Sequence, residues 1–462
     1  MSLIKSISGI RGTIGGAPGD NLTPQDIVEC TAAFGDLMLQ RGKNAKVVIG
    51  RDARISGEMV SSLVTQTLRA LGIDVVDLGL STTPTVEIAV PLENAGAGII
   101  ITASHNPKQW NALKFLNDKG EFISGEDGEE ILQKIEAGDI SYAEVDKLGS
   151  YVKNDTYIQK HIGQIFALDL VDIEAVRARN FKVVVDAVNS TGSIALPPSL
   201  EQMGCETIVL NAEANGHFAH NPEPLPAHLR DLAKTVVKEK ADLGIAVDPD
   251  VDRLAFVCED GEMFGEEYTL VAVADYILQH TKGNTVSNLS STRALSDVTE
   301  KHGGRYSASA VGEVNVVNMM KATDAVIGGE GNGGIIVPEL HYGRDALVGI
   351  ALFLTYLAKN GKTVSALKKS YPSYFISKNK IELTPEIDVD NLLKKIETKY
   401  AHERVNTIDG VKIDLEEGWI HLRKSNTEPI IRIYTESSSE VISENLAKKI
   451  RQDVQEILSG DS

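Results

Sequence analysis

A weakly repeated pattern of strand and turn constrains the fold of this chain more than any other feature. The segments "AKVVIGRDAR" (45–54) and "FKVVVDAVNSTGS" (181–193) each run from a β-branched strand into a polar turn, and "NTVSNLSSTRAL" (284–295) is a looser third copy. Each copy is followed by an amphipathic stretch that indicates a helix. A strand that leads through a helix to another strand is the unit of a mostly parallel sheet. The pattern therefore predicts three similar α/β domains.

The C-terminal part of the chain follows a different pattern. Residues 375–384 and 411–437 alternate between apolar and polar side chains in the manner of strands, and a lysine-containing helix is expected to close the chain. This pattern predicts an antiparallel sheet with helices, so an α+β domain. A chain of 462 residues is too long for one core. The length alone suggests about three or four domains. Three repeated parts and a distinct C-terminal part would divide the chain at residues 1–154, 155–257, 258–372 and 373–462.

The charge balance narrows the classes of function. The chain has 65 acidic and 46 basic side chains and a net charge of −19, which argues against a nucleic-acid binder because such a protein needs a basic face. It has no apolar run long enough for a signal peptide or a membrane span. Its three cysteines, Cys30, Cys205 and Cys258, lack metal-ligand spacing and indicate reduced thiols. We expect a cytoplasmic protein without nucleic-acid or membrane partners; the pattern does not indicate an oligomeric state.

Three aspartates form the sharpest motif. In "GIAVDPDVDRLAFV" (244–257), Asp248, Asp250 and Asp252 alternate, so an extended backbone would direct all three carboxylates to one side. Three close carboxylates repel one another, and a hard divalent cation such as Mg²⁺ removes that repulsion. The alternative is a solvated acidic turn.

Three further segments offer groups that could bind a phosphate, hydroxyl groups or another anion. In "LRKSNTEPIIRIYTE" (422–436), a set of cations, hydroxyls and an amide suits a phosphate monoester, although a surface turn is the alternative. In the glycine-dense segment 328–339, Glu330 and Asn332 could bind hydroxyls, and a simple tight turn is nearly as consistent with the pattern. Arg11 lies in what we expect to be a glycine-rich loop, where it could reach an anion.

Ser104 follows an apolar run that indicates the end of a buried strand. It lacks the flanking glycines of a hydrolase nucleophile, and His105 is a poor base for it because sequence neighbours rarely face each other. One alternative is that Ser104 only caps the start of a helix. A serine beside a divalent cation would instead suit a phosphoryl carrier, whose charge the metal would neutralise.

Together these stretches resemble the α-D-phosphohexomutase family, which includes phosphoglucomutase, phosphomannomutase and phosphoglucosamine mutase. "TASHNP" (102–107) is similar to its phosphoserine loop, "DPDVDR" (248–253) to its metal loop, "GGEGNGG" (328–334) to its sugar loop and "RKSNTEP" (423–429) to its phosphate loop. The resemblance covers nearly the whole chain. It implies three similar mixed α/β domains plus a C-terminal α+β domain around a central cleft.

The resemblance also implies a role for each matching residue. The catalytic candidates are Ser104, Lys114, Arg11, His105 and Arg253. The candidate Mg²⁺ ligands are Ser104, Asp248, Asp250 and Asp252. The candidate substrate-binding residues are Glu330, Asn332, Arg423, Ser425, Asn426, Thr427 and Arg432.

The implied reaction interconverts a hexose 1-phosphate and a hexose 6-phosphate. Phospho-Ser104 would transfer its phosphoryl group, a 1,6-bisphosphate would form and serve as activator, and the other phosphoryl group would return to the serine. The sugar loop has Asn332 and Gly334 where many bacterial members have serine and histidine, and this form resembles archaeal-type phosphoglucosamine mutases. We therefore expect glucosamine phosphate, with a phosphoglucomutase/phosphomannomutase as the alternative. A Mg²⁺-dependent sugar phosphatase and a silent phosphosugar-binding protein are more distant alternatives.

Overall fold

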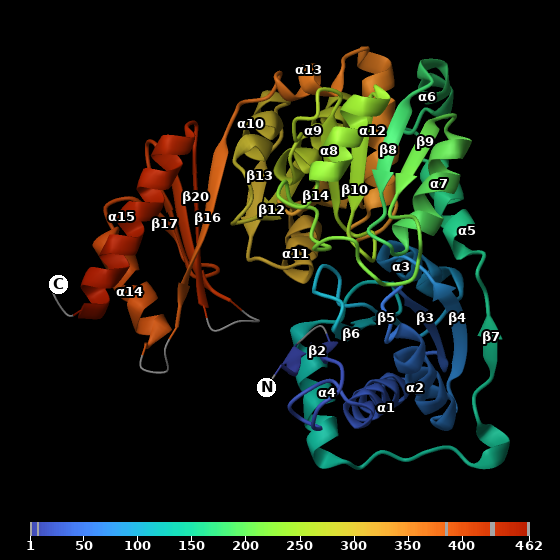
Figure 1. Cartoon of the computed structure of the whole chain (residues 1–462). Helices are drawn as coiled ribbons and strands as arrows, with labels where there is room; N and C mark the ends of the chain where they lie inside the picture. The colour runs from blue at the N-terminus through green and yellow to red at the C-terminus, as the bar shows by residue number, and fades with distance from the viewer. Residues whose placement is uncertain (1, 7–8, 384–386, 426–429, 460–462) are drawn as a thin grey trace. The chain divides into compact units, whose positions relative to one another are not determined.

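Residues 2–6, 9–383, 387–425 and 430–459 are described by a computed structural model (Figure 1). The chain divides into two compact units. Unit 1 comprises Met1–His280 and Asn332–Leu367, and unit 2 comprises Thr281–Gly331 and Lys368–Ser462.

Unit 1 begins with a seven-stranded mixed sheet in the order β1-β2-β6-β5-β3-β4-β7. The strands are β1 (Ile4–Ser6), β2 (Gly9–Thr13), β3 (Lys46–Arg51), β4 (Asp74–Leu80), β5 (Ala97–Ile101), β6 (Trp110–Leu116) and β7 (Tyr151–Lys153). Strand β3 is parallel to β4 and β5, whereas β6 is antiparallel to β5 and β2. The sheet thus combines the expected parallel centre with antiparallel strands from the N-terminus.

Helices cover both faces of this sheet (Figure 1). They are α1 (Pro24–Gln40), α2 (Gly57–Ala70), α3 (Thr83–Leu92) and α4 (Gly125–Ala137). Val47 and Ile49 of β3 belong to the apolar core under α1, α2 and α4, and Val48 belongs to the core under α3. This division follows from the period of two in a strand, which sends successive side chains to opposite faces.

Local sequence signals set the ends of these helices. Thr23 and Asp26 form a capping box at the start of α1, where Pro24 occupies the first turn. Ser124 and Asp127 form a second capping box at α4, which ends at Gly138 in the left-handed conformation (φ +65°).

The second sheet of unit 1 has the order β11-β10-β8-β9. Its strands are β8 (Lys182–Asp186), β9 (Glu206–Leu210), β10 (Leu243–Val247) and β11 (Leu254–Cys258). Strand β8 lies between parallel β9 and β10, and β11 is antiparallel to β10. Helices α7 (Gly192–Gln202) and α8 (Arg230–Glu239) pack on it.

The rest of unit 1 is largely helical. Its elements are a short 3₁₀ helix (Val145–Lys147), α5 (Tyr157–Phe166), α6 (Ile173–Arg179), α9 (Glu266–His280), β15 (Gly334–Ile336), α12 (Ala346–Asn360) and α13 (Val364–Lys368), whose last residue belongs to unit 2. Helix α12 is apolar on all sides and is buried from its first residue to Leu357, because α5, α6 and α9 pack against it.

Unit 2 contains two sheets of different kinds. In one, β12 (Asn284–Asn288) lies between parallel β13 (Tyr306–Ser309) and β14 (Ala325–Glu330), with α10 (Ala294–Lys301) and α11 (Glu313–Thr323) beside it. The other is antiparallel, in the order β16-β20-β19-β18-β17. Its strands are β16 (Phe375–Glu382), β17 (Arg404–Asn406), β18 (Val411–Asp414), β19 (Gly418–Lys424) and β20 (Ile430–Ser437).

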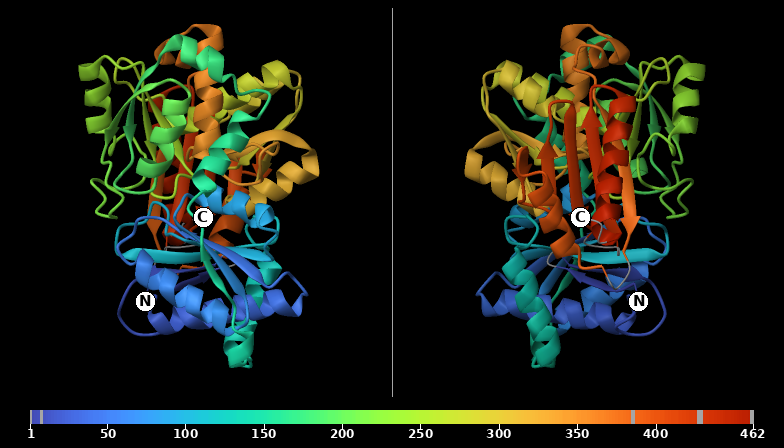
Figure 2. Two further views of the ribbon diagram at one scale, coloured as in Figure 1. Left: turned by 90° about the vertical axis from the view of Figure 1, so that its right-hand side faces the viewer. Right: turned by 90° about the vertical axis from the view of Figure 1, so that its left-hand side faces the viewer.

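Two helices cover one face of the antiparallel sheet. They are α14 (Val389–Lys399) and α15 (Glu440–Ser459), and the right-hand view of Figure 2 looks onto this sheet from their side. Their apolar residues, such as Leu392 and Ile450, share a core with Ile420 and Ile433 of the sheet. The α+β domain predicted for the end of the chain is therefore confirmed.

The three copies of the sequence repeat occupy equivalent places. Each begins with the strand that lies between two parallel neighbours, in the orders β5-β3-β4, β10-β8-β9 and β14-β12-β13. Each strand leads into a helix, α2, α7 or α10. The prediction of three similar α/β domains is confirmed, whereas the four proposed domain boundaries and the central cleft stay predictions.

One local expectation was wrong. Arg11 does not lie in a loop, because Gly9–Thr13 form strand β2 and Arg11 pairs with Ala112 of β6. Among the described residues, no helix is long and apolar enough to cross a lipid bilayer.

A buried histidine joins the two sheets of unit 2. His421 on β19 is 1% exposed; its Nδ1 lies 2.9 Å from the Ser290 hydroxyl, and its Nε2 lies 2.7 Å from the Asp409 carbonyl oxygen. Burial has the largest effect and, with the charges of Lys412 and Arg423, lowers the pKa of His421 to about 4, although its hydrogen bond to Asp409 opposes the shift.

This shift makes the stability of the protein sensitive to acid. An unfolded histidine has a pKa of about 6.5, so between pH 6.5 and 4 the unfolded chain binds more protons than the folded one. We predict that the free energy of unfolding decreases as the pH falls through this window. His421→Gln should reduce that decrease by roughly 2–3 kcal/mol. Urea unfolding at pH 7 and pH 4.5 measures this difference in the free energy of unfolding. His402→Gln, which changes an exposed histidine, is the control. Equal pH dependence in both variants would contradict the assignment.

Candidate active site

Ser104 lies in a turn between two strands of the first sheet. Strand β5 ends at Ile101 and β6 begins at Trp110, so no helix follows Ser104 and the helix-cap interpretation is wrong. The Ser104 backbone has φ +48°, in the left-handed region that residues other than glycine rarely adopt. Its N–H donates to the Thr102 hydroxyl at 2.9 Å, and its hydroxyl donates to Asp248 Oδ2 at 2.7 Å. Such strain persists only where surrounding contacts hold it.

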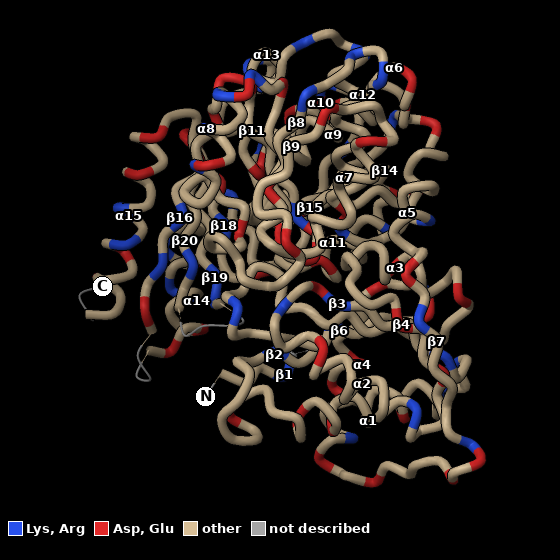
Figure 3. The backbone as a smooth tube through the Cα atoms, turned by 45° about the vertical axis from the view of Figure 1, so that its right-hand side comes forward, with Lys and Arg blue, Asp and Glu red and all other residues tan. Residues whose placement is uncertain are grey.

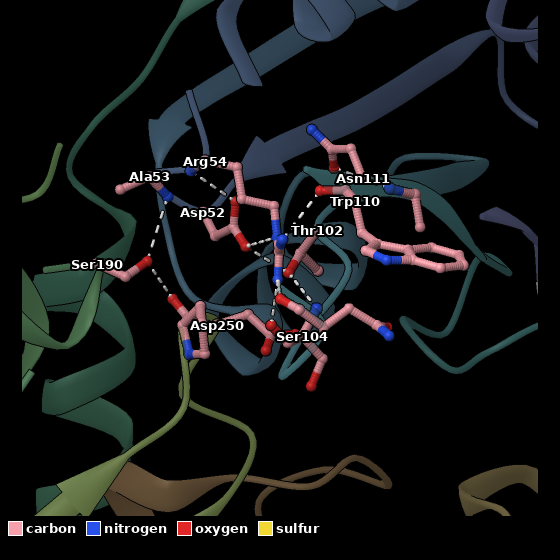
Figure 4. A network of polar contacts seen from close by, with 12 residues as sticks. Asp52, Ala53, Arg54, Thr102, Ser104, Trp110, Asn111, Ser190 and Asp250 are labelled. Carbon is pink, nitrogen blue, oxygen red and sulfur yellow. Dashed lines mark hydrogen bonds and ion pairs between the residues drawn. The ribbon is translucent and has the colours of Figure 1, made fainter. Parts of the chain in front are cut away.

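A buried arginine holds the turn that carries Ser104 (Figure 4). Arg54 is 1% exposed, and its two terminal nitrogens donate to four carbonyl oxygens of the turn. The acceptors are Ser104, Asn106, Pro107 and Trp110. The planar guanidinium fork therefore fixes the path of the turn at both of its ends.

Asp52 balances the charge of this arginine. Arg54 Nε donates to Asp52 Oδ2 at 3.0 Å, and the Thr102 hydroxyl donates to the same oxygen at 2.7 Å. Burial raises the pKa of Asp52, while the Arg54 charge and the Thr102 hydrogen bond act in the opposite direction.

Ser190 connects the strand-β3 turn to the aspartate loop (Figure 4). The Ala53 N–H donates to the Ser190 hydroxyl at 3.3 Å, and that hydroxyl donates to the Pro249 carbonyl oxygen at 2.7 Å. Thr83, at the start of α3, supplies a second connection, because its N–H donates to the Asp250 carbonyl oxygen at 2.8 Å and its hydroxyl to Asp250 Oδ2 at 2.6 Å.

The three aspartates converge, but not through an extended backbone. Strand β10 ends at Val247 and β11 begins at Leu254, and the loop between them turns. Val251 has φ +63°, which is strained for a β-branched residue. One oxygen of each carboxylate nevertheless lies within 4.8 Å of the others, and all three side chains are fully buried. The predicted alternation in extended geometry is therefore wrong, as is the alternative of a solvated acidic turn.

The electrostatics of this cluster fit a cation. Burial, followed by the charges of Asp252 and Asp250, raises the pKa of Asp248 well above its usual value. Burial acts on Asp250 in the same direction, but Lys114 and Thr83 lower the pKa of Asp250 below its usual value. Oδ1 of Asp250 and Oδ1 of Asp252 are buried without a hydrogen-bond partner among the described residues. Carboxylate oxygens that lack partners are the hard ligands that Mg²⁺ prefers.

Basic side chains surround the aspartates in unit 1. Lys114 Nζ lies 3.0 Å from Asp250 Oδ2, and Arg344 Nη2 lies 2.6 Å from Asp252 Oδ2. Burial lowers the pKa of Lys114, but the charges of Asp250 and Asp252 reverse this effect and raise it. The sequence analysis missed Arg344, because its partner lies far away along the chain and no motif marks it.

Two more arginines add positive charge. Arg253 Nη1 lies 3.3 Å from Glu223 Oε1, and Arg11 Nη1 donates to Asn106 Oδ1 at 3.1 Å. Burial, then the charges of Arg253 and Arg54, lower the pKa of Arg11. Mutually repelling guanidinium groups favour an anion between them, which suits a phosphoryl group.

His105 is not placed as a base for Ser104. Its Nδ1 lies 3.5 Å from the Ser104 hydroxyl, which is long for a hydrogen bond. Burial, then the positive charges of Arg253 and Arg11, lower the pKa of His105 well below its usual value. The imidazole is therefore neutral near neutral pH, and its role among the catalytic candidates stays a prediction.

The glycine-dense segment supplies residues to both units. In unit 2, Glu330 is buried, and its Oε1 accepts hydrogen bonds from Asn288 Nδ2 at 2.8 Å and from the Gly312 N–H at 3.1 Å. In unit 1, Asn332 Oδ1 accepts from the Gly334 N–H at 3.1 Å. Gly333 has φ +88°, and a Cβ there would lie 2.2 Å from the Leu254 carbonyl oxygen. This glycine is thus required for the close approach of the segment to β11.

Basic side chains form a row across the antiparallel sheet of unit 2. Arg432 on β20 pairs with Arg423 on β19 and with Lys380 on β16, and directly paired residues share a face of the sheet. In Figure 3, which colours Lys and Arg blue, blue segments lie along the strands of this sheet. Like charges in direct pairing destabilise a sheet unless they are compensated. Glu382, 2.8 Å from Lys380, compensates part of the row, and an anion beside the two arginines would compensate more of it. Motif analysis did not find Lys380, because only strand pairing brings it beside the arginines.

The remaining phosphate-loop candidates are partly outside the described residues. Ser425 is buried at the end of β19, and its N–H donates to the Ile430 carbonyl oxygen at 2.9 Å. Asn426 and Thr427 lie outside the described residues. Burial has the largest effect on Arg423 and lowers its pKa, and Asp409 and Tyr434 oppose this shift.

Comparison with known proteins decides the family. Four consecutive models match this chain: the phosphoglucomutase/phosphomannomutase alpha/beta/alpha domains I, II and III at residues 3–141, 155–261 and 265–374, and the C-terminal domain at residues 381–453. The chain belongs to the α-D-phosphohexomutase family.

Relatives and solved structures agree with this membership. A probable phosphoglucosamine mutase of Methanopyrus kandleri is 36% identical over 94% of this chain and 93% of its own length. A phosphoglucomutase/phosphomannomutase of Thermococcus kodakarensis is 35% identical over 93% of this chain and 94% of its own length. The crystal structure of a phosphoglucomutase/phosphomannomutase family protein from Burkholderia thailandensis is 26% identical, covers 98% of this chain and 97% of its own, and has a TM-score of 0.84.

The family resemblance and the enzyme class, an isomerase of the phosphohexomutase type, are therefore confirmed. The structure brings Ser104, Lys114 and the three aspartates together in unit 1, and Arg423 and Arg432 together in unit 2. The roles assigned to individual residues stay predictions, to which we add Arg54 as a positioning residue.

We predict that Arg54→Lys lowers kcat on the order of 100-fold with KM nearly unchanged, because a lysine cannot hold four carbonyl groups and Ser104 would shift. Steady-state kinetics measures this change. Arg51→Lys, at the end of the strand that precedes Arg54, is the control and should keep both constants. A wild-type kcat in Arg54→Lys, in a protein with unchanged circular dichroism, would contradict the positioning role.

Proposed function

We propose that this phosphohexomutase interconverts glucosamine 1-phosphate and glucosamine 6-phosphate through a phosphorylated Ser104 and a 1,6-bisphosphate intermediate. One observation carries the proposal. The Ser104 hydroxyl donates at 2.7 Å to Asp248, a member of a buried set of three carboxylates. A nucleophilic oxygen beside a site that fits a divalent cation is suited to carry a phosphoryl group.

The proposed cation is Mg²⁺, on which this family depends. Asp248, Asp250, Asp252 and the Ser104 oxygen would hold it, and its charge would stabilise the phosphoryl group during transfer. The chain's own residues would do the rest. Arg11, Arg253 and Arg344 would neutralise the phosphoryl oxygens, and Arg54 would keep the Ser104 turn in its strained conformation.

In the transfer step, the bond between phosphorus and the Ser104 oxygen breaks as a bond from phosphorus to a sugar hydroxyl oxygen forms. Over the whole step, the proton that the sugar hydroxyl loses takes the place of the phosphoryl group on the serine oxygen, so atoms and charge balance. We assign acid–base work to Lys114, whose raised pKa keeps it protonated at rest and able to donate to the serine oxygen. The second transfer reverses these events at the other end of the bisphosphate.

The sugar and the second phosphate would be bound by other candidates. Glu330 and Asn332 would bind sugar hydroxyls. Arg423 and Arg432, with Ser425, Asn426 and Thr427, would bind the phosphate that is not being transferred. The two phosphates must exchange between the transfer site and the phosphate-binding site. The bisphosphate must therefore reorient between the two transfers.

The choice of glucosamine rests on the form of the sugar loop and on the Methanopyrus relative. A glucose or mannose substrate is the second candidate, since the Thermococcus relative is almost as similar. For either sugar we propose a small-molecule substrate, a trace of hexose 1,6-bisphosphate as activator and a cytoplasmic location, with no nucleic-acid or membrane partner.

Phosphorus NMR tests the proposal. The purified protein, Mg²⁺ and a trace of hexose 1,6-bisphosphate are mixed in separate tubes with the 1-phosphates of glucosamine, glucose and mannose. We predict that glucosamine 6-phosphate forms fastest and that Ser104→Ala forms none, because the carrier oxygen is lost. Ser81→Ala, a buried serine outside the turn, is the control. Release of inorganic phosphate alone would indicate a phosphatase, and activity in Ser104→Ala would exclude the carrier.

A further inference from the structure

A second cluster of metal-ligating side chains lies in unit 1, apart from the aspartate loop. It consists of His161 on α5, and His341 and Asp345 ahead of and at the start of α12. Glu87 on α3 lies beside it. His161 and Asp345 are completely buried, and Glu87 is 1% exposed. Nothing in the proposed reaction uses these four residues.

The ligand atoms are close enough to share one ion. Nε2 of His161 lies 2.8 Å from Asp345 Oδ2, and Nε2 of His341 lies 3.2 Å from the same oxygen. One ligand atom of each residue lies within 4.8 Å of the others. Two ligands of a tetrahedral zinc ion lie roughly 3.3 Å apart, so the cluster needs to open by only a few tenths of an ångström.

Each ligand lies near a further polar group on its opposite side. The His341 Nδ1 lies 3.3 Å from Glu87 Oε2, and the His161 Nδ1 lies 3.0 Å from the Thr85 hydroxyl. Asp345 Oδ1 accepts the N–H groups of Leu347 and Val348 at 2.8 and 3.2 Å, which leaves Oδ2 directed at the histidines. The contact between His341 and Glu87 is an ion pair without hydrogen-bond geometry. A carboxylate beside the second nitrogen of a histidine is nevertheless a typical arrangement around zinc.

The charges of the cluster call for two positive charges. Glu87 and Asp345 are two buried carboxylates. Burial lowers the pKa of His341, but its contacts with Asp345 and Glu87 reverse this effect and raise the pKa to about 10, so without a metal this imidazole is protonated and supplies one positive charge. A divalent ion that displaces this proton would supply both charges. Imidazole and carboxylate together suit zinc and its neighbours in the periodic table better than Mg²⁺.

The backbone is shaped to admit these side chains. A Cβ on Gly343 would lie 1.8 Å from Glu87 Oε2 and 2.9 Å from the His341 ring. A larger residue at position 343 would therefore have to displace the Glu87 carboxylate or the His341 ring from the cluster.

We propose that His161, His341 and Asp345 bind a divalent transition-metal ion of the zinc type, with Glu87 and Thr85 orienting the two imidazoles. The ion would join α3, α5 and α12, which come from distant parts of the sequence. It would also support the aspartate loop, because Arg344, next to Asp345, contacts Asp252 at 2.6 Å, and the Ala346 N–H donates to the Val251 carbonyl oxygen at 3.2 Å. The site is structural and separate from the Mg²⁺ site.

Zinc binding tests this proposal directly. Full-length protein is stripped with a chelator, incubated with Zn²⁺ in excess Mg²⁺, passed through gel filtration and analysed for metal. We expect one equivalent of zinc in wild type and in Asp248→Asn, and none in His161→Gln. His220→Gln, which removes a histidine that pairs with Asp186 outside the cluster, is the matched control and should keep the zinc. Wild type that retains no more zinc than His161→Gln would overturn the proposal, as would loss of the zinc in Asp248→Asn.

Two further measurements keep the test decisive if His161→Gln does not fold. Glu87→Gln should weaken zinc binding 10- to 100-fold in competition with a chromophoric chelator, because the orienting carboxylate is lost. Co²⁺ bound to the stripped wild type should give the visible absorption of a tetrahedral site. Unchanged affinity in Glu87→Gln, or Co²⁺ absorption that Asp248→Asn abolishes, would contradict the assignment.

Discussion

The burial of three mutually repelling carboxylates is the constraint on which the rest of unit 1 depends. Asp248, Asp250 and Asp252 are fully shielded from solvent, and isolated buried charges are costly unless they are compensated. The protein compensates with groups from four separate segments. These are the Ser104 hydroxyl, the Thr83 hydroxyl, the Lys114 ammonium group and the Arg344 guanidinium group. The aspartates therefore help to fix the positions of the loops that carry these groups. The sheet in turn fixes the position of the aspartates.

Strain in the backbone accompanies this arrangement. Ser104 and Val251 both adopt left-handed conformations, at φ +48° and +63°, in two loops joined by the hydrogen bond from Ser104 to Asp248. Each conformation costs of the order of 1–3 kcal/mol unless its surroundings fix it. Arg54 fixes the first through four carbonyl groups, and the N–H of Ala346 contributes to the second. The Ser104 oxygen, which we propose as the phosphoryl carrier, is thus positioned before any substrate binds, as fast phosphoryl transfer would require.

The sequence allowed the repeated α/β domains and the main motifs to be predicted, because both depend on local patterns. β-Branched runs ahead of polar turns marked the central strand of each sheet, and Asp248, Asp250 and Asp252 marked the loop after β10. The extended geometry expected for that loop was wrong because a turn at Val251, not strand alternation, brings the carboxylates together.

What sequence analysis missed depends on contacts between distant segments. Arg11 was expected in a loop, but it pairs with β6 about 100 positions later, a partnership that no local pattern encodes. Arg54, Arg344 and Lys380 gained roles only when the fold brought them beside Ser104, Asp252 and Arg432. The same holds for the cluster of His161, His341 and Asp345, whose spacing along the chain matches no metal motif.

The most direct test of this account is the melting temperature of metal-free wild type and Asp248→Asn as Mg²⁺ is added. Asparagine keeps the shape of Asp248 and removes one of the three repelling charges. The account predicts that Asp248→Asn is more stable than wild type without Mg²⁺, and that Mg²⁺ raises the melting temperature of wild type only. His402→Gln, at an exposed position of unit 2, should respond to Mg²⁺ as wild type does. An equal response to Mg²⁺ in Asp248→Asn and wild type would show that the buried carboxylates are not the cation site.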